Sequence, residues 1–386
     1  MGTPDPLQID GLGGTKAVTS KIAIVSLSSR DDADIDYEFA QSGVREDVID
    51  YTANCGNISS AVGGFAIDEG LLSGSKVREG RSVDPKVRTR EVRIFNTGTQ
   101  KVLISHVPVD EEGWSVAEGE YSMAAVPGTG APILMDYRET VGASRNRGLL
   151  PTGNARDRIE IKGEEREVEI TIGDAGNLIV FVKAEDMGVR GDEGAETLTE
   201  RKDLLDRVRE VRGKAANLVG LCEDWRKVDE ESPFMPMLSI LSTAPTPSQS
   251  QHGDEEAAAH IQARLFLDNM THPSMAGTAS VCTAAMSRTR GTLIYDLVAL
   301  EARDAACKQF KIAHPLGIIP VAVEVESGEE TMSPEFSTLS FIRTARRLMD
   351  GVVYVPKSCF EEAGVGAGEG TNGHTNGHVN GMNGTS

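Results

Sequence analysis

The sequence is short of positive charge, of paired cysteines and of long apolar runs, and each shortage excludes a class of protein. It carries 39 Lys and Arg against 59 Asp and Glu, a net charge of −20. Such an acidic surface repels nucleic acid and anionic lipid, so we expect neither as a partner. It also repels an anionic substrate at long range. A carboxylate-binding site would therefore depend on local features, namely helix N-termini and one or two cations.

The five cysteines are odd in number, widely spaced and without any CxxC pair. This pattern supports neither a disulfide framework nor a zinc site. No apolar run approaches the roughly 18 residues of a membrane span, and the N-terminus has no apolar signal-peptide core. We therefore predict a cytoplasmic protein with reduced thiols, no membrane attachment and no bound metal.

The length predicts two domains, at roughly 100–200 residues each. We place them at residues 1–154 and 155–360. Residues 364–386 are a Gly, Asn, Thr and His repetition with almost nothing to bury, which predicts a disordered tail. A second low-complexity stretch, residues 246–256, is typical of a surface loop.

Alternating and β-branched segments predict strands, and segments of helical period predict helices, in no regular alternation. The predicted strands are residues 21–28, 35–41, 87–94, 101–107, 168–172, 178–183, 237–242, 260–266 and 318–325. The predicted helices are residues 58–72, 198–221, 275–287 and 336–348.

The chain also contains an internal duplication at an offset of about 215–217 residues. Each copy consists of strand, loop, strand, tight turn and a helix of small residues, SSAVGG at 59–64 and AGTASVCTAA at 276–285. Helices rich in Gly, Ala and Ser let strands approach closely, so we expect both helices at the centre of curled sheets. A strand and the long helix 198–221 precede the second copy. The first copy has no equivalent of either.

The turn before the first small-residue helix carries a candidate nucleophile. Cys55 lies at the helix N-terminus, where the helix dipole and free N–H groups lower a thiol pKa. Gly56 lets a ligand approach the backbone, and the same N–H groups can bind a carboxylate. Cys55 could equally be a small buried residue in front of an N-capping Asn57. Lys21, at the start of a strand, is either a solvated strand end or a desolvated general base or acid.

In the second copy, His272 and Ser274 occupy the place that we align with Cys55 and Asn57. They are either ligand-binding residues or a turn histidine followed by a helix-capping serine. Cys282 lies inside the second small-residue helix, which is typical of a core residue. The loop DGLGG at 10–14 lacks the lysine and spacing of a nucleotide-binding loop, so no nucleotide cofactor is expected.

Several segments together resemble one family. They are PDPLQIDGLGG (4–14), TSKIAIVS (19–26), DIDYEFAQ (34–41), NCGNISSAVGGFAI (54–67) and LLPTGN (149–154). They resemble the 2-methylaconitate isomerases, whose relatives include aconitate Δ-isomerase, methylitaconate Δ-isomerase and oxalomesaconate tautomerase. The resemblance runs from about residue 2 to about residue 360.

The resemblance implies an α+β fold of the diaminopimelate-epimerase type: two repeated domains, each wrapping a curled sheet around a central helix, with a cofactor-free site between them. It implies catalytic roles for Lys21 and Cys55. We assign substrate binding to the residues around them and in the second copy: Thr19, Ser20, Gly56, Asn57, His272 and Ser274.

Related epimerases use one cysteine in each half. Here the second position carries Thr271-His272-Pro273, which favours a double-bond shift with one thiol over a two-thiol racemase. Relative to the family pattern, the opening strand and its Arg-Gly-Gly-Thr-Ser-Lys-like loop are missing.

The predicted function is therefore a cofactor-independent isomerase that shifts a C=C bond in a small polycarboxylate, with a homodimer as the candidate assembly. The alternatives are a tautomerase or epimerase of another acidic metabolite and a non-catalytic binding protein.

Overall fold

The computed structural model describes residues 1–74, 77–124, 126–163, 165–244, 259–267, 269–326 and 331–355. Its longer strands are β1 (Lys21–Leu27), β2 (Ile35–Ser42), β5 (Thr89–Asn96), β6 (Lys101–Pro108), β9 (Ile133–Asp136), β10 (Asp157–Ile159), β11 (Val168–Ala175), β12 (Asn177–Lys183), β13 (Met237–Thr243), β14 (Ile261–Leu267), β16 (Gln309–His314), β17 (Gly317–Val325) and β18 (Phe336–Arg343).

The two-residue strands are β3 (Ile49–Asp50), β4 (Arg78–Glu79), β7 (Tyr121–Ser122), β8 (Thr129–Gly130) and β15 (Met270–Thr271). Of these, β3, β4 and β15 pair with the longer strands, and β7 and β8 form a separate two-stranded sheet. The α-helices are α1 (Gly56–Asp68), α2 (Ala195–Glu200), α3 (Lys202–Leu218), α4 (Val228–Glu231), α5 (Gly277–Ser287), α6 (Leu293–Leu297) and α7 (Leu300–Arg303).

The longer strands form one continuous mixed sheet in the order β1-β2-β5-β6-β9-β18-β17-β16-β14-β13-β12-β11-β10. In the first half β1 and β2 are antiparallel, α1 follows, and β5 returns parallel to β2. In the second half β13 and β14 are antiparallel, α5 follows, and β16 returns parallel to β14. This repeated topology confirms the duplication and the α+β fold expected from the sequence.

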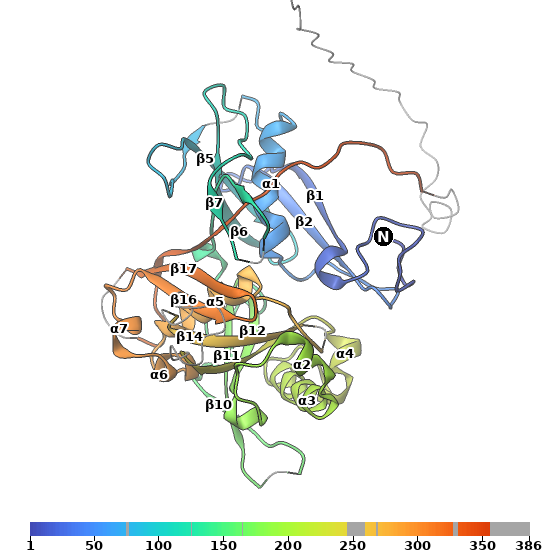
Figure 1. Cartoon of the computed structure of the whole chain (residues 1–386), viewed down its shortest axis with the longest axis vertical. Coiled ribbons are helices and arrows are strands. Elements are labelled where there is room, and N and C mark those ends of the chain that lie inside the picture. The colour runs from blue at the N-terminus through green and yellow to red at the C-terminus, as the bar shows by residue number, and fades with distance from the viewer. Residues whose placement is uncertain are drawn as a thin grey trace, which may run out of the picture. The chain divides into compact units, whose positions relative to one another are not determined.

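Each half wraps its strands around one helix (Figure 1). The first central helix, α1, packs against β1, β5 and β6, and the second, α5, packs against β11, β12, β17 and β18. Every residue of α5 is buried, as the small side chains predict. In α1 the face formed by Asn57, Ala61 and Phe65 is exposed, so the expectation of burial on nearly all faces holds only for α5.

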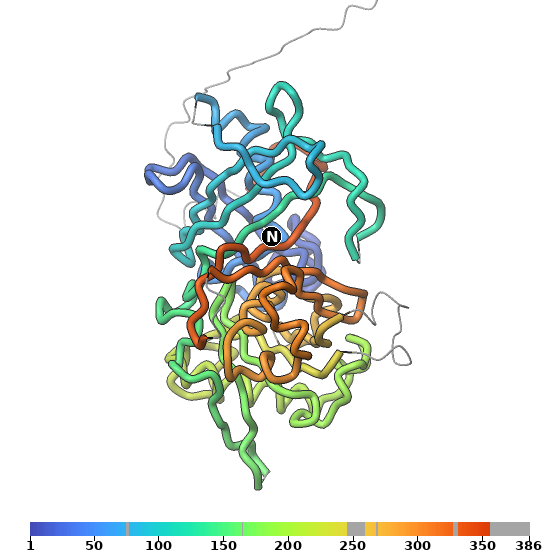
Figure 2. The backbone as a smooth tube through the Cα atoms, turned by 90° about the vertical axis from the view of Figure 1, so that its left-hand side faces the viewer, coloured from blue at the N-terminus to red at the C-terminus, as the bar shows by residue number. Residues whose placement is uncertain are grey.

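The predicted helix at 336–348 is wrong. Residues Phe336–Arg343 form strand β18, which pairs with β17 on one side and with β9 on the other. Leu, Ala and Arg around residues 342–348 suggested a helical period, but the backbone of this segment instead completes hydrogen bonds with two strands. In Figure 2 the chain of this segment, coloured orange to red, crosses the middle of the molecule.

Two smaller predictions also need correction. The predicted helix 198–221 is divided into α2 and α3 by the extended backbone of Arg201. Strands β9, β10 and β16 were not predicted, because each is short and lacks a clear alternation. The other predicted strands and the helices at 58–72 and 275–287 are confirmed to within a few residues.

Residues 1–346 form one compact unit, so the division near residue 154 stays a prediction. Residues 347–355 contain no helix or strand. The predicted loop 246–256 and tail 364–386 lie outside the described residues. Within the part of the chain that is described, no helix combines the length and apolar character that a membrane span requires.

Candidate functional site

Lys21 and Cys55 lie in contact, although 34 residues separate them in the chain. Lys21 is the first residue of β1, and Cys55 is the N-cap of α1, with extended backbone angles. The Lys21 ammonium Nζ donates a hydrogen bond of 3.1 Å to Cys55 Sγ. The chain therefore places an amine beside a thiol at the beginning of a helix.

The surroundings of Cys55 favour its thiolate. Burial by itself raises the pKa of this thiol. The positive charge of Lys21 and the backbone N–H groups of Ile58 and Asn57 lower the pKa by more than burial raises it, so the net shift is downward. Free N–H groups and the dipole at a helix N-terminus stabilise an anion in the same way. The position beside Lys21 and at the N-terminus of α1 therefore makes the Cys55 thiol more acidic than an ordinary cysteine.

The N-terminus of α5 reaches the same place. A Cβ atom on Gly56 would lie 3.0 Å from Phe341 Cζ and 3.3 Å from the backbone nitrogen of Thr278. A Cβ atom on Gly277 would lie only 2.5 Å from Phe341 Cζ. A side chain at Gly277 would require the Phe341 ring to move, and one at Gly56 would be tightly packed. Because the two helix starts approach this closely, their free N–H groups can act on one ligand.

Asn177 connects the two helix starts. Its Nδ2 donates to the Asn54 carbonyl at 2.7 Å and to the Thr278 hydroxyl at 3.0 Å, and its Oδ1 accepts from the Asn54 N–H at 3.1 Å. All three residues are buried. This network holds the turn that carries Cys55 in a defined position relative to α5.

A small cavity of about 40 Å³ opens onto the thiol, with Lys21, Cys55 and Thr278 in its wall. Asn54 also lines it and is 3% exposed, yet neither atom of its side-chain amide has a hydrogen-bond partner of normal geometry. The amide lies near the hydroxyl of Tyr137, whose pKa burial raises. Buried amides are seldom left unpaired, so Asn54 is a candidate to hydrogen-bond a ligand.

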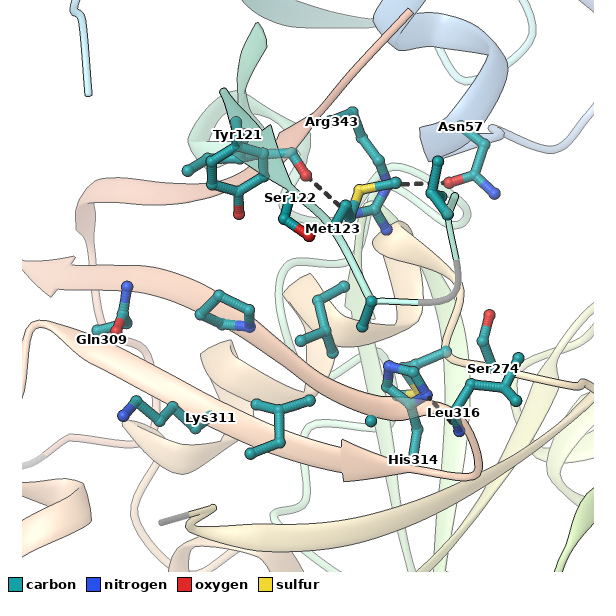
Figure 3. A pocket seen from close by; sticks show the side chains of 18 residues that line it. Asn57, Tyr121, Ser122, Met123, Ser274, Gln309, Lys311, His314, Leu316 and Arg343 are labelled. Carbon is teal, nitrogen blue, oxygen red and sulfur yellow. Dashed lines mark hydrogen bonds between the residues drawn. The ribbon is translucent and has the colours of Figure 1, made fainter. Parts of the chain in front are cut away.

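A larger cavity of about 1030 Å³ lies next to the small one, and Asn57 borders both. Figure 3 shows Asn57, Met123 and Arg343 on one side of it and Lys311 on the other. Its size is at the upper end of the roughly 300–1,000 Å³ that is typical of ligand clefts.

Arg343 is a site residue that the sequence reasoning missed, because it lay in the wrongly predicted helix. It ends β18 and is 6% exposed. Its Nε donates to Asn57 Oδ1 at 3.0 Å, and its guanidinium lies over the Phe341 ring at 4.4 Å. Burial lowers the pKa of Arg343 to about 10, so it stays charged near neutral pH.

The predicted residues of the second copy lie near the site but in different roles. Ser274 lines the large cavity. His272 is buried beside it, and its Nδ1 accepts the Ser274 N–H at 3.1 Å. Burial, together with the positive charges of Lys21 and Arg343, lowers the pKa of His272 to about 4. His272 is therefore neutral near pH 7.

Thr19 and Ser20, which we expected to bind substrate, line neither cavity. The Thr19 hydroxyl donates to the carbonyl oxygens of Gly14 and Lys16. The Ser20 hydroxyl donates to Gln8 Oε1 at 2.8 Å. Both side chains are engaged within the N-terminal loop that precedes Lys21, and their substrate-binding role stays a prediction.

The alignment of the two copies also changes. The N-cap of α5 is Ala276 rather than Ser274, so Ala276-Gly277-Thr278 is the structural counterpart of Cys55-Gly56-Asn57. The central glycine shared by these tripeptides was the signal that could have set this register. The second half still has no cysteine at the equivalent position. Among the described residues, no three His, Cys, Asp or Glu side chains group as metal ligands would.

Comparison with known proteins finds a family match over nearly the whole chain. The model of the family described as "PrpF protein" matches residues 1–356. The chain is 36% identical to 3-methylitaconate isomerase from Eubacterium barkeri, covering 93% of this chain and 88% of that protein. It is 34% identical to 4-oxalomesaconate tautomerase from Pseudomonas putida, over 92% and 86% of the two chains.

A third relative is 2-methyl-aconitate isomerase from Shewanella oneidensis, 30% identical over 92% of this chain and 87% of that protein. Among solved structures, methylitaconate-delta-isomerase superposes with a TM-score of 0.72 at 34% identity, covering 92% of this chain and 87% of that one. A hydroxyproline epimerase from Agrobacterium vitis has a TM-score of 0.50 at 10% identity, over 87% of this chain and 76% of that one, which shows a common fold alone.

Proposed function

This chain belongs to the PrpF family, and from that premise we propose that Lys21 and Cys55 are the proton-transfer pair of its reaction. The chain is an isomerase that moves a C=C bond in a small polycarboxylate. The observation that carries the assignment of residues is the 3.1 Å hydrogen bond between Lys21 Nζ and Cys55 Sγ at the N-terminus of α1.

The proposed reaction begins with proton removal by the Cys55 thiolate from the carbon next to the double bond. The electron pair of that C–H bond forms the new double bond, and the pair of the old double bond takes a proton from the Lys21 ammonium at the far carbon. Transfer of the thiol proton from Cys55 to the neutral Lys21 amine then restores the starting state. No atom or electron is gained or lost in this cycle.

In the intermediate, negative charge spreads into the carboxylate next to the reacting carbons. The free N–H groups at the beginnings of α1 and α5 and the unpaired amide of Asn54 are positioned to stabilise that charge. Gly56 and Asn57, predicted as substrate-binding residues, provide backbone N–H groups here. Ser274 contributes a wall of the larger cavity, and His272 supports it as a neutral acceptor.

A tautomerase activity is the second candidate, because a relative of similar identity is named 4-oxalomesaconate tautomerase. It would use the same proton relay on a substrate in which one end of the shifting system is a carbonyl oxygen. A substrate panel distinguishes the two activities. The remaining alternative, a binding protein without catalysis, requires that no acid in the panel exchange protons.

Proton exchange in D₂O, followed by NMR, tests the proposal. We expect deuterium at the allylic carbon of aconitate, methylaconitate or methylitaconate, together with the shifted isomer. Folded protein that neither incorporates deuterium nor forms an isomer with any unsaturated polycarboxylate would contradict it. Exhaustive chelation and dialysis should leave the rate unchanged, since we propose neither a metal nor another cofactor.

The role of Lys21 can be measured separately from turnover. Because its charge helps to lower the Cys55 pKa, Lys21→Ala should move the pH midpoint of Cys55 alkylation upward. Lys21→Arg, which keeps the charge, is the matched control and should move it less. An unchanged midpoint in folded Lys21→Ala protein would mean that Lys21 does not act on the Cys55 thiol.

The homodimer and the cytoplasmic location stay predictions. Sedimentation can test the first, and cell fractionation can test the second.

A further inference from the structure

Among the residues that the structure describes, no carboxylate balances the charge of Arg343. None of their Asp or Glu side chains forms an ion pair with it, and none of them provides a hydrogen-bond acceptor for Nη2. Its Nη1 donates to the Ile342 carbonyl at 2.9 Å. The ionisable groups that act on it are the tyrosines at 121 and 137 and Cys55. A buried cation without an anionic partner is costly, so its presence requires an explanation.

Its position suggests what completes the charge balance. A Cβ on Gly277 would lie 3.1 Å from Arg343 Nη2, so this nitrogen lies at the first residue of α5. Through Nε the guanidinium also contacts Asn57 in the first turn of α1. Lys21, Arg343 and the Cys55 thiolate together leave one positive charge, beside two helix N-termini. That excess of positive charge in an otherwise acidic protein fits an incoming anion.

We propose that Arg343 binds a second carboxylate of the substrate, separate from the carboxylate that takes up charge near Cys55. This rests on the proposed function, because it assumes a polycarboxylate at the same site. Arg343 lines the larger cavity beside Asn57 (Figure 3), and Asn57 also borders the small cavity at Cys55, so one small ligand can extend from the thiol to the guanidinium. The planar guanidinium can donate two parallel hydrogen bonds to a carboxylate.

The consequence is selection for ligands with at least two ionised carboxylates. A monocarboxylate would leave Arg343 buried and unbalanced, whereas a dicarboxylate or tricarboxylate would neutralise it. Arg343 is then a specificity-determining residue, and the proton transfer itself stays with Lys21 and Cys55.

Calorimetric binding of propane-1,2,3-tricarboxylate tests this, because that acid has no double bond to shift. Arg343→Gln should weaken binding about 10- to 100-fold, as expected for loss of charge-assisted hydrogen bonds. It should leave the weak binding of the monocarboxylate crotonate unchanged. Lys311→Gln, which removes a cation from the opposite side of the same cavity, is the matched control and should change the affinity far less. Equal effects of the two variants, unchanged binding by Arg343→Gln, or no binding by the unmodified protein would overturn the proposal.

A second pair of variants covers the case in which Arg343→Gln fails to fold. Asn57→Asp can accept the same Nε hydrogen bond while neutralising Arg343, so it should keep or raise the unfolding temperature and weaken tricarboxylate binding. Asn57→Ala removes the amide without adding charge and should weaken binding less. If Arg343 were only structural, Asn57→Asp would bind no more weakly than Asn57→Ala.

Failure of the Arg343 assignment and failure of the proposed function are distinguishable. Cys55→Ser should still bind the tricarboxylate, because the thiol is not its anion receptor. If Cys55→Ser also isomerised aconitate at the original rate, the proton-transfer assignment would fail while the binding result for Arg343 remained.

Discussion

Strands β1 and β13 occupy equivalent places in the two halves, but only β13 is buried. The Ile24 side chain of β1 is 53% exposed, whereas Ile240 at the matching position of β13 is fully buried. The difference arises from the neighbours of each strand. β12 pairs in parallel with β13, and α3 packs against it, whereas β1 pairs only with β2 among the strands that the structure describes.

The candidate catalytic residues lie in the half whose first strand is less buried. The less covered half carries Lys21 at the start of β1 and Cys55 at the N-cap of α1, whereas the matching positions of the buried half are Met237 and Ala276. The two halves thus share a topology, and under the proposed mechanism these two side chains make the first half the reactive one. Fold and function are separable here, because a strand start and an N-cap can each accept several residue types.

The largest expected difference is between Cys55, the N-cap of α1, and Cys282, which lies inside the buried helix α5. Cys55→Ser should reduce the rate about 10²- to 10⁴-fold, because a serine hydroxyl does not ionise near neutral pH and cannot relay the proton. Cys282→Ser should keep most of the rate but lower the free energy of unfolding, since that thiol is fully buried and its pKa is raised by burial. Steady-state kinetics and thermal unfolding measure both. If Cys55→Ser keeps more than about a tenth of the rate, Cys55 is only a turn residue.

The matching isoleucines test the difference in burial. Ile240→Ala should lower the free energy of unfolding by about 2–5 kcal/mol, because it leaves a cavity in a packed core. Ile24→Ala, on the exposed face of β1, should cost less than about 1 kcal/mol. Chemical denaturation of the two variants measures the difference. Equal losses would mean that the outer face of β1 is covered in solution.

The neutral state of His272 predicts a pH-dependent difference. Its pKa of about 4 in the fold lies below the ordinary 6.5, so the unfolded chain binds more protons as the pH falls through this interval. The stability contribution is thus complete above about pH 6.5 and declines toward pH 4. His272→Asn, whose Oδ1 can accept the same N–H, should lose roughly 2–3 kcal/mol less between pH 7 and 4.5, at ~1.4 kcal/mol per pKa unit. Parallel stability curves would argue against a buried neutral histidine.

The smallest expected effect compares neighbouring glycines on the two faces of α1. A Cβ on Gly63 would lie 2.9 Å from Val107 Cγ2, so Gly63→Ala should destabilise by about 1–3 kcal/mol. On Gly64 the nearest atom would be at 3.6 Å, an ordinary contact, so Gly64→Ala should stabilise by up to about 1 kcal/mol through helix propensity. Thermal unfolding measures both changes. Destabilisation by Gly64→Ala would show that this face of the helix is more closely packed.

Much of the fold could be read from local pattern. The small-residue helices, the duplication and most strands followed from periodicity, because each segment's own side chains determine which face can be buried. β18 could not be read in this way. Its assignment depends on two partner strands, β9 and β17, that lie far from it or across a loop in the sequence. Local composition therefore favoured a helix where the tertiary structure required a strand.

The candidate site likewise contains residues that local sequence could identify and residues that it could not. Neighbouring residues in the sequence indicate a strand start and a helix N-terminus, and this made it possible to identify Lys21, Cys55, Gly56 and Asn57. Asn54, beside them, gave no signal of its own, since being unpaired is a property of its surroundings.

By itself, the sequence of this protein determined two repeated halves, a thiol at one helix start and a shortage of positive charge elsewhere. These are features of composition and short-range order. Only the tertiary structure decided that Lys21 contacts that thiol, that α5 begins beside α1, and that the buried Arg343 lies at their junction. Each of these contacts joins residues separated by tens to hundreds of positions. The distances between them depend on which strands pair across the whole sheet, and a local sequence pattern does not specify that long-range pairing.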